Sequence, residues 1–416
     1  MEYRQRVVDA QLATLVSAMG AVVIEGPKAC GKTMTAMQVA QSAVRLDVDV
    51  NARNAAAVDP SLVLEGDTPR LIDEWQIVPA IWNHVRRLVD DRQANGQFLL
   101  TGSSVPVDDE TRHTGAGRIA RLRMRPMSLY ESGHSSGTVS LAGLMAGQAS
   151  RSADPGLDVQ EIAKRLAVGG WPRFVDAPVD QALTAMRAYV DEVRRTDVQR
   201  VSGVSYDPDR VLHLMRSIAR NVGTMTGVKT LARDIAGPEE PIDHGTAFAY
   251  YEALERLMVI EDQPAWGTHL RSKARVRVSP KRHFVDPALA VAVMRATPDR
   301  LFKDMELLGF LFESLVIRDM RIYAQTVDAK ILHYKDNTDL EVDAIIESGD
   351  GRWGAVEVKL GPNMVDKGAE TLLALARKVD TDKCGPPRFL AVITGFGLGY
   401  VRPDGVHVVP VGALGP

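Results

Sequence analysis

Residues 26–33, Gly26-Pro27-Lys28-Ala29-Cys30-Gly31-Lys32-Thr33, match the pattern G-x-x-x-x-G-K-[ST] at every position. In this pattern the backbone N–H groups of a glycine-rich loop surround the phosphates of a nucleotide. The lysine reaches the outer phosphates, and the final hydroxyl holds Mg²⁺. The stretch therefore predicts a nucleotide ligand, a Mg²⁺ cofactor and part of an active site.

The residues on both sides of this loop agree with that prediction. Residues 21–25 form a short apolar, β-branched run that suits a buried parallel strand. A helix-favouring stretch begins at Met34, which we include among the predicted nucleotide contacts. The amino terminus of this helix adds partial positive charge to the phosphate site. Strand, glycine loop and helix follow in the order that phosphate binding requires.

A second acidic strand end is needed to complete such a site. Leu71 and Ile72 form a short apolar strand, and Asp73 and Glu74 follow it directly. We predict that Asp73 holds Mg²⁺ together with Thr33, and that Glu74 acts as the general base for the attacking water. Paired carboxylates are also common on helix surfaces, so this motif gains its meaning from the glycine loop upstream.

Two further residues are candidates for the same site. Residues 97–104 predict a buried strand that ends in small hydroxyl residues, where Ser103 can approach the γ-phosphate; an ordinary strand-to-loop turn fits equally well. Arg118 precedes the next predicted strand and is a candidate arginine finger, acting on its own site or on that of a neighbouring copy. A simple surface arginine explains the same position.

Length and composition limit the remaining possibilities. The chain has 416 residues, more than one ordinary core accommodates, so two or three domains are expected. A formal net charge of −3 means that any basic surface is local. Two cysteines exclude a disulfide framework and a zinc knuckle. We find no signal peptide and no apolar run of about 18 residues, which predicts a cytoplasmic protein without a membrane partner.

The middle of the chain predicts helices followed by a basic segment. A linker rich in small residues covers about 136–160, and helical stretches follow at 185–197, 209–222, 228–237 and 245–258. The last three have the outline of a helix-turn-helix. The basic residues of the next segment are Arg271, Lys273, Arg275, Arg277, Lys281 and Arg282.

The first four of these cations recur at every second position, which on a strand places them on one face. A basic hairpin after three helices is typical of a winged helix that contacts a phosphate backbone. We therefore predict nucleic-acid binding by Arg271, Lys273, Arg275 and Arg277. A solvated hairpin face, or a contact with an acidic protein surface, would give the same pattern.

A second group of charged residues lies near the carboxyl terminus. Residues 337–347 and 353–359 predict two strands joined by a hairpin turn. Asp343 lies on the first strand, and Glu357 and Lys359 share one face of the second. Two converging carboxylates can bind a divalent cation while the lysine orients water or offsets phosphate charge. Glu313, on a preceding helix, can add a carboxylate. An exposed hairpin with a salt bridge is the alternative.

Taken together, these motifs resemble those of a family of prokaryotic AAA-type ATPases related to the archaeal-ATPase group. The resemblance rests on residues 26–33, Asp73-Glu74, residues 101–104 and the D…E-x-K set, and covers nearly the whole chain. It implies Mg²⁺-dependent ATP binding, a winged helix, and a carboxyl-terminal domain of unknown function with a restriction-endonuclease-like, PD-(D/E)xK fold. Lys28, Ala29 and Cys30 depart from the family, whose members often carry an arginine there.

The predicted fold is α/β in three parts. Residues 1–150 form a P-loop parallel-sheet ATPase domain, 151–295 a helical and winged-helix segment, and 296–416 a nuclease-like α/β domain. Two functional hypotheses follow. In the first, ATP hydrolysis drives a DNA-binding module that cleaves DNA at Asp343, Glu357 and Lys359. In the second, the chain is an ATP-dependent switch or scaffold whose nuclease-like domain only binds DNA or protein. An arginine finger acting between copies would require a homo-oligomer.

Overall fold

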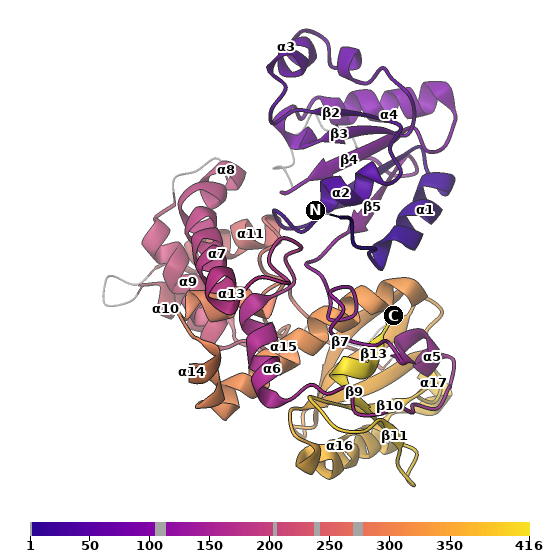
Figure 1. Cartoon of the computed structure of the whole chain (residues 1–416), viewed down its shortest axis with the longest axis vertical. Helices are drawn as coiled ribbons and strands as arrows, with labels where there is room; N and C mark the ends of the chain where they lie inside the picture. Colours follow the sequence, from indigo (N-terminus) through magenta and orange to yellow (C-terminus); the bar gives the residue numbers. More distant parts are fainter. Residues whose placement is uncertain (1, 105–113, 203–205, 237–241, 269–277) are drawn as a thin grey trace. The chain divides into compact units, whose positions relative to one another are not determined.

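The computed structural model describes residues 2–104, 114–202, 206–236, 242–268 and 278–416 (Figure 1). By its internal contacts the chain divides into two compact units. The first comprises residues 1–126, 197–205 and 253–259, and the second comprises 127–196, 206–252 and 260–416. The predicted basic residues Arg271, Lys273, Arg275 and Arg277 lie outside the described residues.

The first unit is built on a parallel sheet in the order β2-β3-β4-β1-β5 (Figure 1). Its strands are β1 Ala21–Glu25, β2 Ser42–Arg45, β3 Arg70–Asp73, β4 Phe98–Gly102 and β5 Ile119–Arg123. Its helices are α1 Val8–Ala18, α2 Lys32–Met37, α3 Val50–Val58, α4 Ile81–Arg92 and α8 Val198–Ser202. The parallel sheet predicted for this part of the chain is confirmed.

Alternation along the central strands gives this sheet a core on each face. On β1, Val23 packs in a cluster with Trp75 and Trp82, while Val22 and Ile24 belong to a second cluster. Because successive strand residues point to opposite faces, a strand with apolar residues at every position must be covered on both sides. The sheet is therefore buried, and its loops are left to form the site.

The second unit begins with a helical region. Its helices before the carboxyl-terminal sheet are α5 Leu141–Met145, α6 Val159–Val168, α7 Val179–Glu192, α9 Pro208–Arg220, α10 Val228–Ala236, α11 His244–Arg256, α13 Pro287–Val293, α14 Pro298–Phe302 and α15 Met305–Tyr323. The buried helix α13 contacts α6, α7 and α9. The helical middle of the chain is confirmed, with helices near each predicted position.

A mixed sheet in the order β11-β12-β10-β9-β8-β7 completes the second unit. Its strands are β7 Ala329–Lys335, β8 Glu341–Ser348, β9 Trp353–Lys359, β10 Leu390–Thr394, β11 Tyr400–Val401 and β12 His407–Pro410. The short strands β6 Val139–Ser140 and β13 Leu414–Gly415 pair separately, and α16 Val365–Lys378 and α17 Thr381–Cys384 precede β10. The predicted hairpin of β8 and β9 is present, with Ala344 opposite Val356.

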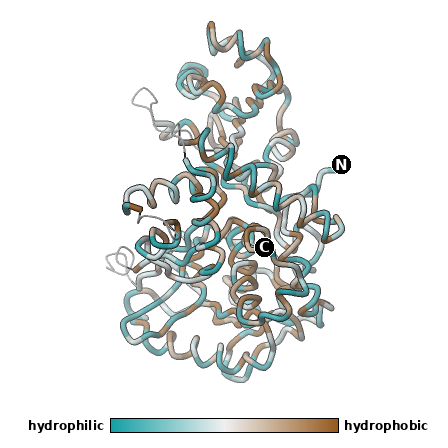
Figure 2. Tube along the Cα trace, turned by 90° about the vertical axis from the view of Figure 1, so that its left-hand side faces the viewer, coloured by the Kyte–Doolittle hydropathy of each residue, from teal (hydrophilic) through white to brown (hydrophobic). Residues whose placement is uncertain are grey.

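Hydrophobic and hydrophilic residues alternate closely along most of the chain (Figure 2). Among the described residues, no helix combines the length and the apolar character needed to cross a membrane. The apolar residues instead supply the clusters that cover the two sheets.

Candidate functional site

The glycine loop follows β1 and leads into α2, as predicted. Gly31 has φ of +108° and Ala29 has φ of +59°, so the backbone between strand and helix turns sharply. A Cβ atom on Gly26 would lie 2.3 Å from the carbonyl oxygen of Met124. Only glycine fits there, which keeps the loop backbone pressed against the segment that follows β5.

The ammonium of Lys32 lies inside the turn of this loop. Its Nζ atom donates to the carbonyl oxygens of Gly26 at 3.0 Å and Pro27 at 2.9 Å. Lys32 is buried, with 5% of its surface exposed, although it makes no ion pair among the described residues. The two carbonyls hold the ammonium in the loop, where the motif requires a cation. Because both carbonyls are neutral, they do not offset the charge of the ammonium.

Thr33 and Asp73 meet at the carboxyl edge of the sheet. The register pairs Asp73 on β3 with Thr101 on β4, so both strands end at the level of the loop. Thr33 Oγ1 donates to Asp73 Oδ1 at 2.8 Å, and Thr101 Oγ1 donates to the same oxygen. The two predicted Mg²⁺ ligands are thus in contact. Hydroxyl and carboxylate oxygens are the donors that Mg²⁺ prefers, so this pair fits the ion.

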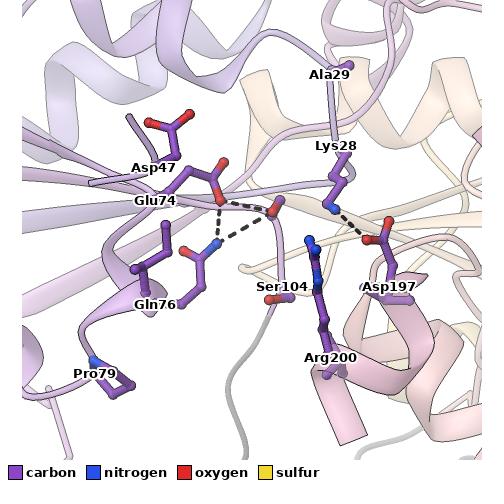
Figure 3. A pocket seen from close by; sticks show the side chains of 13 residues that line it. Lys28, Ala29, Asp47, Glu74, Gln76, Pro79, Ser104, Asp197 and Arg200 are labelled. Carbon is purple, nitrogen blue, oxygen red and sulfur yellow. Dashed lines mark hydrogen bonds and ion pairs between the residues drawn. The ribbon is translucent and has the colours of Figure 1, made fainter. Parts of the chain in front are cut away.

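Glu74 turns away from the end of β3 and faces Ser103. Its left-handed backbone, with φ of +55°, directs the side chain toward the end of β4. Ser103 Oγ donates to Glu74 Oε2 at 3.0 Å, and Gln76 Nε2 donates to the same oxygen (Figure 3). The predicted general base and the predicted γ-phosphate contact therefore lie side by side.

These side chains border a pocket of about 620 Å³ within the first unit (Figure 3). Lys28, Ala29, Glu74, Ser103, Asp197 and Arg200 are among its lining residues. The volume falls in the range of small-molecule sites. Lys28 forms an ion pair with Asp197. The sequence did not identify Asp197 and Arg200, because nothing in the local pattern links residues so far downstream to the loop.

The remaining residues predicted for the nucleotide site, Cys30, Met34 and Arg118, lie in different surroundings. Cys30 is buried under the loop, and its carbonyl oxygen accepts from Arg6 Nη1 at 2.9 Å. Met34 is largely exposed on α2. Arg118 lies before β5, at the amino edge of the sheet and opposite the glycine loop, where its Nε donates to Asp90 at 2.7 Å. The structure does not bring Arg118 to the pocket of its own chain, and a role in a neighbouring copy stays a prediction.

In the second unit, the structure brings together the carboxyl-terminal charged residues. Asp343 and Glu357 lie one position beyond the pair of Ala344 and Val356 in the β8–β9 hairpin, and the N–H of Asp343 donates to Glu357 Oε1 at 3.3 Å. Lys359 Nζ lies 2.6 Å from Glu357 Oε2 and 3.7 Å from Asp343 Oδ2. The predicted D…E-x-K set is therefore compact.

Lys281 also belongs to this cluster, which the sequence did not predict. Its Nζ lies 2.9 Å from Glu313, 3.1 Å from Glu341 and 3.3 Å from Asp343. Lys281 and Arg282, which follow the four predicted DNA-contacting cations in the sequence, are both buried, and Arg282 pairs with Asp262. Glu341 was not predicted either, and its alternation with Asp343 along β8 was a signal that could have identified it.

Burial and charge shift the ionisation of these groups. Burial, followed by repulsion from Asp343, raises the pKa of Glu313 to about 7 and that of Glu357 to about 8. Burial opposes the ionised form of Asp343, yet Lys281 and Lys359 outweigh it and lower its pKa. Burial disfavours the charge on Lys281, but Glu313, Asp343 and Glu341 raise its pKa.

The predicted metal role of Asp343 and Glu357 does not agree with this geometry. Within the described residues, no group of three or more His, Cys, Asp or Glu side chains is arranged to hold a metal ion. The space between the carboxylates of Glu313, Glu341 and Asp343 instead holds the ammonium of Lys281. The cluster therefore contains a built-in cation.

Comparison with known families divides the chain into three matches. Residues 19–133 match a family model described as an AAA domain. Residues 159–300 match a domain of unknown function, DUF8612, and residues 308–414 match another, DUF4143. The chain thus carries an AAA-type ATPase domain, which implies nucleotide binding, followed by these two domains.

Individual relatives are distant. Uncharacterized protein Rv2008c of Mycobacterium tuberculosis and uncharacterized protein Mb2031c of Mycobacterium bovis are each 25% identical over 347 residues, or 81% of this chain and 70% of theirs. The Walker-type ATPase PABY2304 of Pyrococcus abyssi is 11% identical, with 69% of this chain and 94% of that chain covered and a TM-score of 0.43. A DNA replication initiation factor covers 60% of this chain and 86% of its own at 12% identity, with a TM-score of 0.22.

Proposed function

We propose that the chain hydrolyses ATP in the pocket of its first unit, with Mg²⁺ as cofactor. The hydrogen bond from Thr33 to Asp73, 2.8 Å long, carries this proposal. It joins the hydroxyl of the glycine loop to the acidic end of β3, which are the two protein groups that hold Mg²⁺ in P-loop enzymes. The AAA-domain match covers both residues.

Each remaining group has a proposed role that follows from its contacts. Lys32 exchanges the carbonyls of Gly26 and Pro27 for β- and γ-phosphate oxygens, which attract an ammonium more strongly than neutral carbonyls do. Glu74 positions the attacking water and accepts its proton. Ser103, already hydrogen-bonded to Glu74, contacts the γ-phosphate. Bound Mg²⁺ would offset charge that develops on the phosphates.

Substitution of Glu74 tests this proposal. Glu74→Gln retains shape and hydrogen-bonding capacity but removes the base, so we expect ATP to bind normally while phosphate release slows by about 10²–10⁴-fold. Glu65→Gln, at an exposed position of the same unit, is the matched control and should behave like wild type. Hydrolysis by Glu74→Gln at the wild-type rate would remove Glu74 from the mechanism.

ATP turnover is proposed to control the rest of the chain as a regulatory switch. This favours the second hypothesis from the sequence. The observation behind it is that Lys281 pairs with Asp343, which the first hypothesis assigns to DNA cleavage, as well as with Glu313 and Glu341. DNA remains a proposed partner through Arg271, Lys273, Arg275 and Arg277, whose alternation in the sequence suits a phosphate backbone.

The salt dependence of binding tests the DNA contact. Replacing the four alternating cations by alanine should lower the slope of log affinity against log salt on duplex DNA by up to about 0.9 for each lost contact. A variant that lacks four exposed lysines elsewhere in the second unit, Lys164, Lys303, Lys330 and Lys367, controls for net charge. An unchanged slope in the four-residue variant would exclude this segment as the DNA contact.

A further inference from the structure

The cluster around Lys281 is built from separate parts of the second unit. Glu313 comes from α15, Glu341 and Asp343 come from β8, and Lys281 comes from the chain before α13. The three carboxylates lie 2.9–3.3 Å from one nitrogen atom, and the Lys281 side chain is 2% exposed. A buried cation surrounded in this way occupies the position that a metal ion would take among such ligands.

The oxygens of the two predicted metal ligands already have N–H or ammonium partners. Asp343 Oδ1 faces Lys281 Nζ at 3.3 Å, and Asp343 Oδ2 accepts from the Val358 N–H at 2.9 Å. Glu357 Oε2 accepts from Lys359 at 2.6 Å, and Oε1 accepts from the Asp343 N–H at 3.3 Å. Mg²⁺ requires oxygen ligands at about 2.1 Å in a nearly ideal octahedral arrangement. Each ligand would have to give up such a partner first.

The backbone of Lys281 is fixed as well. Lys281 and Gln263 exchange two backbone hydrogen bonds, of 3.0 and 2.9 Å. The Gln263 side chain donates to the carbonyl oxygen of Asp343 at 2.8 Å and also contacts His283 Nε2 at 3.1 Å. The strand that carries Asp343 and the residue that carries the ammonium are thus tied to the same glutamine. Moving Lys281 aside would break this arrangement.

We propose that Lys281 permanently replaces the divalent cation of this carboxylate cluster, so that the carboxyl-terminal domain binds no catalytic metal there and cleaves no nucleic acid. This inference is independent of ATP hydrolysis in the first unit. The domain retains the residue pattern of a metal-dependent nuclease but uses it to lock β8, β9 and α15 together.

Charge balance supports the replacement. Lys281, Lys359 and Lys335, which lies 3.4 Å from Glu341, supply three positive charges against the carboxylates of Glu313, Glu341, Asp343 and Glu357. Ion pairs within the protein therefore balance most of the charge of the cluster without any metal ion. A divalent cation beside Lys281 would add two positive charges within a few ångströms of an ammonium.

Mn²⁺ binding measured by electron paramagnetic resonance tests the proposal. The full chain carries Asp73→Asn throughout, so that the predicted metal ligand of the first unit is removed, and no nucleotide is added. Four proteins are compared in this background: the parent, Asp343→Asn, Lys281→Met and the double variant Lys281→Met with Asp343→Asn. Lys330→Met, which changes an exposed lysine of β7, is the matched control.

We expect the parent and Asp343→Asn to bind the same amount of Mn²⁺, so that none of the Mn²⁺ bound by the parent depends on Asp343. Lys330→Met should bind as much Mn²⁺ as the parent. Lys281→Met should gain one Mn²⁺ per chain, and the double variant should lose it again. Mn²⁺ bound by the parent and lost in Asp343→Asn would overturn the proposal even if Lys281→Met failed to fold. A folded Lys281→Met protein that gains no Mn²⁺ would overturn it too. Mn²⁺-dependent cleavage of plasmid DNA by the parent, lost in Asp343→Asn, would do the same.

Discussion

The nucleotide site of the first unit and the carboxylate cluster of the second both place a buried lysine near acidic residues, but the two lysines have different partners. Lys32 donates to the carbonyls of Gly26 and Pro27. Lys281 forms ion pairs with Glu313, Glu341 and Asp343. The first ammonium is held by neutral groups, whereas the second is neutralised where it lies.

This difference indicates which site is open to a ligand. A phosphate oxygen is a stronger partner for an ammonium than a carbonyl is, so Lys32 can exchange its partners with a gain in energy. Lys281 has no such gain available, because it is itself buried and its partners are already carboxylates. A buried lysine thus has neutral partners in one unit and carboxylate partners in the other.

The largest expected effect is on stability. Lys281→Met removes the common cation of Glu313, Glu341 and Asp343, of which Glu313 is buried, and breaking a buried pair in this way costs about 3–5 kcal/mol. Lys32→Met removes hydrogen bonds to neutral carbonyls only, for which we expect about 1–2 kcal/mol. Urea-induced unfolding of both variants measures the contrast. A loss of stability in Lys32→Met equal to that in Lys281→Met would contradict the distinction between the two lysines.

The second effect is on catalysis, where we expect Lys32→Met, rather than Lys281→Met, to cause the larger loss. Lys32→Met removes a donor aimed at phosphate charge, and loss of one such donor lowers the rate of hydrolysis by about 10²–10³-fold. Phosphate release at saturating ATP measures this loss. Circular dichroism of Lys32→Met checks that the protein is folded, and an active, folded Lys32→Met protein would show that the ammonium does not act on ATP.

The parts predicted well from sequence are those whose structure depends on residues that are close together along the chain. Residues 26–33 contain the complete loop, and the apolar run before them predicts β1, so the strand, loop and helix follow from one continuous stretch. Asp73 and Glu74 were recognised because a strand end is a local feature. The contact of Thr33 with Asp73 then follows from parallel strands that end at one edge.

The role of Lys281 was missed because it depends on a tertiary contact. In the sequence, Lys281 follows a series of alternating basic residues, a pattern that indicates a solvated face. Its pairing with Gln263 instead turns the ammonium toward Glu313 and Asp343, which lie 32 and 62 residues away along the chain. The same reason explains Asp197, which pairs with Lys28 across 169 residues. Periodicity carries no information about such long-range partners.

A smaller effect is expected where the nucleotide loop meets the segment after β5. Gly26→Ala adds a Cβ atom 2.3 Å from the Met124 carbonyl oxygen, so the backbone of the loop must shift. Overpacking of this kind costs about 1–3 kcal/mol, and we expect nucleotide affinity to fall by about tenfold or more. Titration with a fluorescent ATP analogue measures this. Gly309→Ala, where an added Cβ meets no atom within 4 Å, is the control. Unchanged affinity in Gly26→Ala would show that the loop tolerates the shift.

The smallest effect concerns the pH dependence of the carboxylate cluster. The pKa of Glu357 is raised to about 8 in the folded chain, so the folded state binds more protons than the unfolded state between about pH 4.5 and pH 8. Glu357 therefore makes the chain less stable as pH rises through this window. Asp343 acts in the opposite direction, but its lowered pKa places that effect at acidic pH, outside the window.

Glu357→Gln cannot ionise, so it resembles the protonated wild-type side chain at pH 5 and avoids the loss at pH 8. Since one pKa unit corresponds to about 1.4 kcal/mol, we expect Glu357→Gln to gain at least about that much stability relative to wild type between pH 5 and pH 8. Urea unfolding at the two pH values measures the gain, and Glu370→Gln, an exposed residue on α16, should show none. If the difference between Glu357→Gln and wild type stayed constant with pH, Glu357 would be ionised throughout, and the cluster would carry the surplus negative charge that a metal ion could neutralise.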